Sequence, residues 1–283
     1  MTDSVETFAL GGDLPVRRIG FGNRWLAGPN SWGPPEDPAG AAAVVHRAVE
    51  LGVNFFDTAD CYGPAVAEGV LADALHPYPE GLVVATKVGM THPSPTEWIP
   101  LGRPEYLRQQ VELSLRRLRL ETVDLLYLHR IDPAVPLADQ LGALAELREA
   151  GKIRHIGLSE VTVEQIKESR DITPIASVQN RYHLTDRKSE AVLDFCEQEG
   201  IAFVPFLPIG KGAHTAGDGV LATIAGELGA TQAQVALAWL LLRSPVMLPI
   251  PGTKSLAHLA ENVAAQAIDL TDDHLRLLGA LSQ

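Results

Sequence analysis

Residues 123–159 read VDLLYLHRIDPAVPLADQLGALAELREAGKIRHIGLS, and this stretch contains one complete β-α-β unit. Its two ends, Val123–His129 and Ile153–Leu158, are short and mostly apolar, which is typical of buried strands. Between them, residues 137–150 have apolar residues at helical spacing, and Gly151 follows where a helix often ends in a left-handed residue. Strands joined by a helix pair in parallel. The stretch therefore predicts an α/β fold built on a parallel sheet.

The same alternation of a short apolar run and a helical pattern repeats along the chain. The expected strands are Ile19–Gly22, Val53–Asp57, Leu82–Thr86, Val123–His129, Ile153–Leu158, Ala176–Gln179, Ala202–Pro205 and Val246–Ile250. The expected helices cover residues 38–51, 65–75, 104–118, 137–150, 162–170, 187–199, 218–242 and 255–265. Start signals support them, because Asp37 precedes Pro38 and Thr162 with Gln165 reads as a capping box. Eight such units are typical of a (β/α)8 TIM barrel.

An open doubly wound sheet is the competing architecture, and one glycine motif argues against it. Residues 20–25 read GFGNRW, which begins like a dinucleotide-binding loop but lacks the third glycine. At the N-terminus, Thr7–Leu10 and Leu14–Arg17 flank a Gly-Gly-Asp turn, which predicts a β-hairpin that caps the barrel bottom. No linker rich in glycine, serine or charge interrupts residues 1–283, so we expect a single domain.

Composition limits the classes of partner. The net charge of −12 repels phosphate backbones, so we expect no nucleic-acid partner. No apolar run approaches the roughly 20 residues of a membrane helix, and the start MTDSVETFAL lacks a secretion signal, so a cytoplasmic protein without a membrane partner is expected. Cys61 and Cys196 match no metal or redox spacing, which predicts free thiols and no metal.

Ionisable residues gather where three neighbouring strands are expected to end. Asp57 and Tyr62 follow the second strand, Lys87 the third and His129 the fourth, at the rim where barrel enzymes carry their chemistry. A phenol is a poor acid near neutral pH unless a cation stabilises its phenolate, and Lys87 can supply that charge. A buried lysine needs an anionic partner, which Asp57 provides. His129 can then donate a hydrogen bond to a carbonyl oxygen.

These residues and several later motifs together resemble the aldo-keto reductase superfamily. The resemblance runs through Asn54–Gly63 (NFFDTADCYG), Thr86-Lys87, Asp124–Asp132 (DLLYLHRID), Gly151–Ser159 (GKIRHIGLS), Val178–Asn180 (VQN), Ile250–Thr253 (IPGT) and Glu261-Asn262. It implies that Asp57, Tyr62, Lys87 and His129 form a catalytic tetrad. In that tetrad Tyr62 protonates a carbonyl oxygen while hydride arrives from a nicotinamide.

The resemblance also implies the cofactor contacts. Ser159 and Gln179 match positions that hold the nicotinamide carboxamide, and Phe206 matches a ring that stacks on the nicotinamide. The remaining implied contacts, at the pyrophosphate and adenosine end, are Gly210, Lys211, Gly212, Pro251, Gly252, Thr253, Lys254, His258, Glu261 and Asn262. They favour NADPH, with NADH left open.

Three positions depart from the family pattern. Glu160 replaces an asparagine that often follows the serine, and Leu207 replaces a serine near the pyrophosphate. His258 replaces an arginine that often holds the 2′-phosphate, and Lys254 can compensate for it.

Substrate choice is expected to rest on the loops 23–36 and 88–103, because no long C-terminal loop is expected to close over the substrate. Trp25, Trp32 and Trp98 in these loops line a substrate pocket or pack within the loops. The chain is similar to bacterial pyridoxal reductases in Leu26–Pro29 (LAGP), Gly33–Pro35 (GPP), Phe203–Phe206 (FVPF) and Val235–Leu241 (VALAWLL). Pyridoxal is thus a candidate among small-molecule carbonyl substrates.

Two other functions remain open at this point. Potassium-channel β subunits resemble the same family, which allows a cofactor-binding regulatory module. Lys87 on a barrel strand also allows a Schiff-base aldolase, although that activity leaves Tyr62 and residues 250–262 unexplained. The oligomeric state is not indicated.

Overall fold

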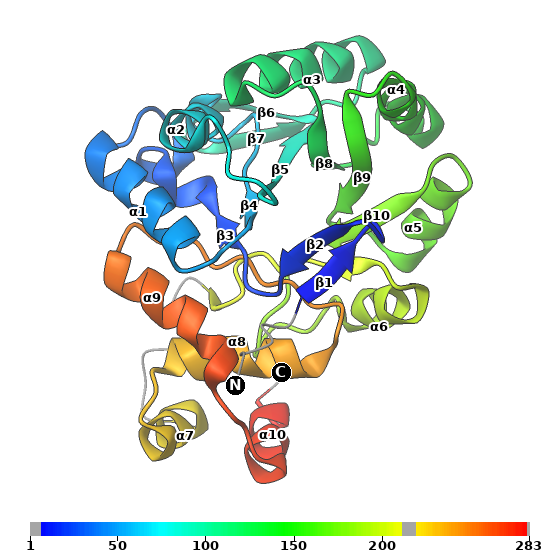
Figure 1. Ribbon diagram of the computed structural model, residues 1–283. Coiled ribbons are helices and arrows are strands. Elements are labelled where there is room, and N and C mark those ends of the chain that lie inside the picture. The colour runs from blue at the N-terminus through cyan, green and yellow to red at the C-terminus, as the bar shows by residue number, and fades with distance from the viewer. Residues whose placement is uncertain (1–6, 211–218, 282–283) are drawn as a thin grey trace.

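A curled parallel sheet of seven strands lies at the centre of the chain, and helices cover its outer face (Figure 1). The coordinates are a computed structural model that describes residues 7–210 and 219–281. In order across the sheet, the strands are β11 (Ala202–Phe203), β10 (Ile175–Gln179), β9 (Ile153–Ser159), β8 (Val123–Leu128), β5 (Val83–Val88), β4 (Phe55–Asp57) and β3 (Phe21–Gly22). The helices are α1 (Pro38–Glu50), α2 (Val66–Leu75), α3 (Pro104–Leu118), α4 (Leu137–Glu149), α5 (Val163–Arg170), α6 (Glu190–Glu199), α7 (Val220–Leu228), α8 (Gln232–Arg243), α9 (Leu256–Ala264) and α10 (Asp272–Gly279). The predicted parallel α/β fold is confirmed.

The eighth expected strand, residues 246–250, does not form a regular strand, but it contacts both ends of the sheet. On one side the Leu248 N–H donates to the Phe203 carbonyl at 2.8 Å. On the other side the Gly20 N–H donates to the Pro249 carbonyl at 3.0 Å. Pro249 has no N–H to donate, which prevents a continuous ladder. The arrangement is consistent with a (β/α)8 barrel.

The N-terminal hairpin forms as predicted, with β1 (Thr7–Leu10) and β2 (Leu14–Arg17) paired antiparallel. In Figure 1 it lies in front of the curled sheet. Its apolar side chains share one buried cluster with strand residues from around the sheet. The members of this cluster from the hairpin and the strands include Leu10, Leu14, Val16, Phe55, Leu125, Tyr127 and Leu248.

The single helix predicted over residues 218–242 is wrong, because the chain breaks it into α7 and α8. Gly229 ends α7 with φ of 60°, a left-handed conformation that glycine adopts without strain. Thr231 then starts α8 through a capping box with Gln234. Both signals are present in the sequence, and they create an additional helix N-terminus.

Two further elements were not predicted. Residues 88–103 contain an antiparallel hairpin, β6 (Met90–Ser94) with β7 (Glu97–Pro100), and α10 follows the last expected helix.

The capping contacts of Asp37 and Thr162 are confirmed, and so are two free, buried cysteines. Among the helices of the described residues, none is both long and apolar enough to cross a membrane.

Arg18 ties the start of the sheet to the segment that follows α8. Its side chain is buried, and its Nη2 donates to the carbonyls of Leu241 and Ser244, each at 2.6 Å. Its Nε donates to the Met247 carbonyl at 3.4 Å. These contacts help to hold residues 246–250 between the two ends of the sheet.

We predict that Arg18→Met lowers the free energy of unfolding by about 2–3 kcal/mol, because buried carbonyls lose charge-assisted hydrogen bonds. Urea denaturation measures this loss. The matched control is Arg47→Met, because Arg47 lies on the exposed part of α1 and pairs only with Glu50 among the described residues. A surface pair contributes little, so the control should change stability by less than about 0.5 kcal/mol. Equal effects from the two variants would contradict the tethering role of Arg18.

Candidate functional site

A cavity of about 1020 Å³ opens at the carboxyl ends of the strands. This volume lies at the upper end of the roughly 300–1,000 Å³ that small-molecule sites occupy. The predicted site residues that line it are Trp25, Asp57, Tyr62, Trp98, His129, Ser159, Gln179, Phe206, Pro251, Gly252, Thr253, Lys254, His258, Glu261 and Asn262. The cavity thus brings together residues that are more than 200 positions apart in the chain.

Lys87 lies beneath the cavity, with none of its surface exposed, and forms an ion pair with Asp57. Its Nζ donates to Asp57 Oδ1 at 2.5 Å and to the Thr58 carbonyl at 2.8 Å. Burial alone would lower the pKa of Lys87, but the Asp57 carboxylate more than offsets this and raises it. Lys87 therefore keeps its positive charge although it is out of contact with solvent.

Tyr62 follows β4 in a turn and projects over Lys87. The Lys87 Nζ lies 5.1 Å from the centre of the Tyr62 ring. Burial raises the pKa of Tyr62, while the charge of Lys87 acts in the opposite direction. The phenol therefore carries its proton at neutral pH, and a cation lies close enough to stabilise the phenolate when that proton leaves.

His129 follows β8, and its ring centre lies 5.9 Å from that of Tyr62. Its Nδ1 is 3.3 Å from the Cys61 Sγ, so Nε2 is the nitrogen that remains to contact a ligand in the cavity. Burial lowers the pKa of His129 well below its usual value, and the charges of Lys87 and Arg130 add to this effect. The imidazole is therefore neutral.

Asp60 is a buried carboxyl group that the sequence interpretation left without a role. Neither of its carboxylate oxygens has a hydrogen-bond partner among the described residues. Burial raises its pKa well above the usual value, and nearby Glu68 adds to the rise. Asp60 also lines a smaller cavity of about 250 Å³. Its carboxylate lies within 4.8 Å of the Cys61 thiol and the His129 ring, a set of donors that a divalent metal can use.

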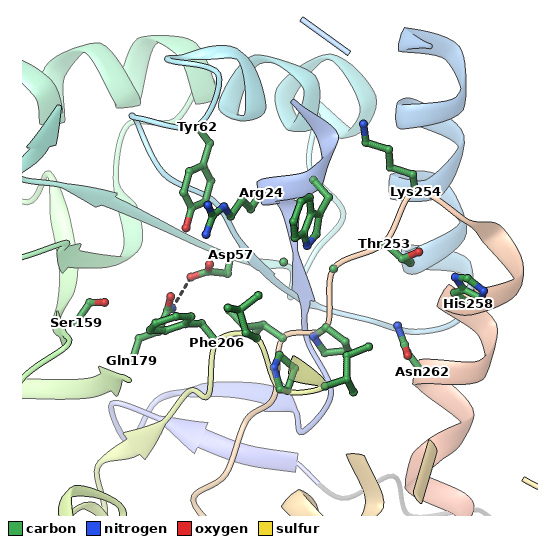
Figure 2. Close-up of a pocket in the computed structure, with 18 of the residues that line it drawn as sticks. Arg24, Asp57, Tyr62, Ser159, Gln179, Phe206, Thr253, Lys254, His258 and Asn262 are labelled. Carbon is green, nitrogen blue, oxygen red and sulfur yellow. Dashed lines mark hydrogen bonds between the residues drawn. The ribbon is translucent and has the colours of Figure 1, made fainter. Parts of the chain in front are cut away.

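The residues predicted to hold a nicotinamide lie beside Asp57 and make additional contacts. Gln179 donates from Nε2 to Asp57 Oδ2 at 2.8 Å, which orients the carboxylate (Figure 2). Ser159 Oγ accepts from Arg130 at 2.9 Å, and the Arg130 guanidinium lies 6.0 Å from the Phe206 ring. Arg130 is thus a cavity residue that the sequence interpretation missed.

The opposite end of the cavity is formed by backbone and helix N-termini. At Gly252 an added Cβ would lie 2.5 Å from the Gly22 carbonyl oxygen, so only glycine allows the two loops to approach so closely. The first residues of α8, from Thr231, line the cavity, and Ser255 caps α9 nearby. Helix N-termini favour anions, and Lys254 adds a cation. This end therefore fits the phosphates of a dinucleotide.

Three of the predicted site residues that the structure describes do not line the cavity: Lys87, Gly210 and Trp32. Lys87 lies beneath it, Gly210 is buried outside its lining, and Lys211 and Gly212 fall outside the described residues. Trp32, for which the substrate pocket and loop packing were both left open, packs edge-on against His92 of the 88–103 loop, with ring centres 5.1 Å apart.

The residues in the lining that were not predicted include Arg24, Met90, Pro100 and Arg130. Arg24 directly precedes Trp25, which was predicted to line the substrate pocket. Its position in the same loop was therefore the sequence signal that could have identified Arg24 as a pocket residue.

Two of the three departures from the family pattern lie at unusual backbone conformations. Glu160 has φ of 57° and Leu207 has φ of 52°, in a region that residues other than glycine rarely adopt. Glu160 accepts a hydrogen bond from the Arg181 N–H at 2.7 Å. Its side chain is absent from the cavity lining. Strained residues of this kind gather at functional sites, where the surrounding structure holds them.

Comparison with known proteins places the chain in one family. A sequence model described as the Aldo/keto reductase family matches residues 18–283. The chain is 48% identical to an uncharacterized oxidoreductase of Schizosaccharomyces pombe, covering 93% of this chain and 85% of that protein. It is 42% identical to pyridoxine 4-dehydrogenase of Escherichia coli, covering 99% of each chain. Among solved structures, an aldo-keto reductase of Klebsiella pneumoniae in complex with NADPH aligns with a TM-score of 0.83 and 26% identity, covering 98% of this chain and 94% of that one.

We predict that His129 stays neutral in the native state at mildly acid pH, because burial lowers its pKa. In the unfolded chain His129 takes up a proton below about pH 6.5, so the unfolded state binds more protons than the native state there. Stability is therefore lost as pH falls from about 7 to 5. Thermal unfolding across this range should show a smaller loss for His129→Asn than for the wild type. The same substitution at exposed His46 is the control, and an equal loss in all three proteins would contradict the prediction.

Proposed function

The chain belongs to the aldo/keto reductase family and is an NAD(P)H-dependent oxidoreductase, and from this we propose that it reduces an aldehyde or ketone to an alcohol, with Tyr62 as the proton donor. The observation that carries the proposal is the buried Lys87–Asp57 ion pair directly below Tyr62, at the wall of the large cavity. A charged lysine in that position has a clear use, because it makes a phenol a better acid.

Residues of the chain itself supply the proton that the carbonyl oxygen takes up on reduction. A nicotinamide cofactor held in the cavity would supply hydride to the carbonyl carbon. Tyr62 gives its hydroxyl proton to the carbonyl oxygen, and the remaining phenolate is stabilised by Lys87. Asp57 keeps Lys87 charged, and Gln179 holds Asp57 in position. His129, which is neutral, donates from Nε2 to the same carbonyl oxygen and orients it.

The cofactor that best fits the cavity is NADPH. Ser159, Gln179 and Phe206 would hold the nicotinamide beside Asp57 and Tyr62. Lys254, His258 and the N-termini of α8 and α9 would hold the phosphates, because Lys254 is a cation and helix N-termini favour anions. The NADPH complex of the Klebsiella pneumoniae relative supports this choice. NADH stays a weaker candidate.

The architecture proposed for this enzyme is one domain, residues 1–283, folded as a closed (β/α)8 barrel. The hydrogen bonds of residues 246–250 to both ends of the sheet support closure. The hairpin of β1 and β2 would cover the bottom of the barrel, which its burial against inward-facing strand residues supports. The cavity would then lie at the opposite end, where barrel enzymes place their active sites.

Pyridoxal is the proposed substrate, which the similarity to pyridoxine 4-dehydrogenase of Escherichia coli supports. Trp25 and Trp98 supply flat apolar walls suited to an aromatic aldehyde. The Schiff-base alternative is disfavoured, because the Lys87 amine is fully buried and bonded to Asp57. Such an amine is charged and cannot act as a nucleophile.

We predict that Tyr62→Phe lowers kcat for carbonyl reduction by about 100- to 10,000-fold, the usual contribution of a general acid. Because the phenylalanine ring keeps the wall of the cavity, NADPH binding should be retained. Steady-state NADPH oxidation and a fluorescence titration of NADPH measure the two properties. Full activity in this variant would show that Tyr62 is not the proton donor.

We predict that the wild-type protein reduces pyridoxal with NADPH as the reductant. The kcat/KM of this reaction should be higher with NADPH than with NADH. The measurement is kcat/KM for pyridoxal, methylglyoxal, simple aromatic aldehydes and aldoses with each cofactor. The favoured carbonyl should be aromatic, because tryptophans wall the cavity. Turnover with none of these compounds would argue against the reductase and for a binding module.

A further inference from the structure

Arg24 places a guanidinium group inside the cavity, beside the proposed proton donor. It lies in the short 3-10 helix η1 (Asn23–Leu26) that follows β3. Its Cζ is 6.0 Å from the centre of the Tyr62 ring, 5.8 Å from that of Trp25 and 5.1 Å from that of Trp98. Figure 2 shows the guanidinium next to Tyr62 and above Asp57. A substrate carbonyl that contacts Tyr62 therefore comes close to this charge.

The charge of Arg24 has no anionic partner among the described residues. Its Nε donates to the Ser31 Oγ at 3.0 Å, and Ser31 is buried with a left-handed φ of 60°. This bond holds the side chain in place, and neither terminal nitrogen has a hydrogen-bond partner in the part of the chain that the structure describes. The nearby Asp57 carboxylate is already bonded to Lys87 and Gln179.

Arg24 is only partly exposed, and withdrawing part of a guanidinium from water without an anionic partner is unfavourable. The chain has a net charge of −12 and 35 acidic residues, so a counter-ion would be easy to supply. Instead, the guanidinium lies 5.1 to 6.0 Å from the centres of three aromatic rings, and Ser31 fixes its direction. This arrangement resembles a preformed recognition site, in which the ligand provides the anion.

We propose that Arg24 binds an anionic oxygen that the carbonyl substrate carries near its carbonyl group, either a carboxylate or a phenolate. The proposal rests on the reductase function and adds the substrate class. A planar guanidinium with free terminal nitrogens matches such oxygens in geometry and charge. The indoles of Trp25 and Trp98 suit a flat ring between the anion and the carbonyl. Aromatic aldehydes with an anionic substituent on the ring therefore fit this site.

The test compares each acid with its neutral counterpart in the presence of NADPH. For the carboxylate, 2-, 3- and 4-carboxybenzaldehyde are measured against their methyl esters. For the phenolate, pyridoxal is measured against its 3-O-methyl ether. The wild type is expected to prefer at least one anion over its neutral partner by about 10- to 100-fold in kcat/KM, the usual range for a charge-assisted hydrogen bond. The pair that shows the preference identifies the source of the oxygen.

Arg24→Gln should abolish that preference, mainly by raising KM for the anion, and Arg24→Lys should restore part of it. Arg276→Gln makes the same charge change on the exposed surface of α10 and is the matched control. It should keep the wild-type preference. Thermal unfolding verifies that each variant is folded, and a folded Arg24→Gln variant that keeps the wild-type preference would overturn the inference.

The possible failures are distinguishable. If the wild type reduces none of the aldehydes, the proposed function is wrong, and the inference about Arg24 is refuted together with it. If it reduces acids and neutral counterparts equally well, the reductase stands and anion binding by Arg24 is refuted. If Arg24→Gln lowers kcat equally for acids and neutral counterparts, Arg24 instead assists proton transfer from Tyr62, which also overturns the inference.

Discussion

The ion pair between Lys87 and Asp57 is the interaction on which the site depends. A carboxylate 2.5 Å away helps a lysine with no exposed surface to keep its proton. The two residues meet because β4 and β5 are adjacent parallel strands, and Gln179 from β10 bonds the second carboxylate oxygen across the sheet. The curl of the sheet, which brings β10 close to β4, therefore has a chemical result. It assembles a buried, fixed positive charge, over which the phenol of Tyr62 lies.

Charge is distributed unevenly between the surface and the cavity. The chain is acidic overall, with a net charge of −12, yet Arg24, Arg130 and Lys254 all line the cavity. Two of these cations are held by hydrogen bonds to serines, Arg24 to Ser31 and Arg130 to Ser159. Because charges interact more strongly in a poorly solvated cavity than on the surface, these few residues outweigh the net charge. An anionic cofactor is compatible with an acidic protein for this reason.

Loops after the strands carry the features that sequence patterns describe least well. Ser31 and Leu207 both adopt left-handed backbone near the cavity, although neither is glycine. Such conformations are unfavourable for an isolated segment and persist only when packing imposes them. The break between α7 and α8 differs, because Gly229 and the capping box of Thr231 are local signals. It was predictable, whereas the strained loop residues were not.

The sequence by itself determined the order of strands and helices, most helix starts and the strand ends at which Asp57, Lys87 and His129 lie. Hydrophobic periodicity and helix capping depend on residues a few positions apart, so both can be recognised in the sequence without a structure. Tertiary structure alone decided that Gln179 bonds Asp57, that Trp32 packs on His92 and that the guanidinium of Arg24 turns toward Tyr62. Those outcomes depend on side-chain directions in irregular loops, which long-range packing sets and no local period encodes.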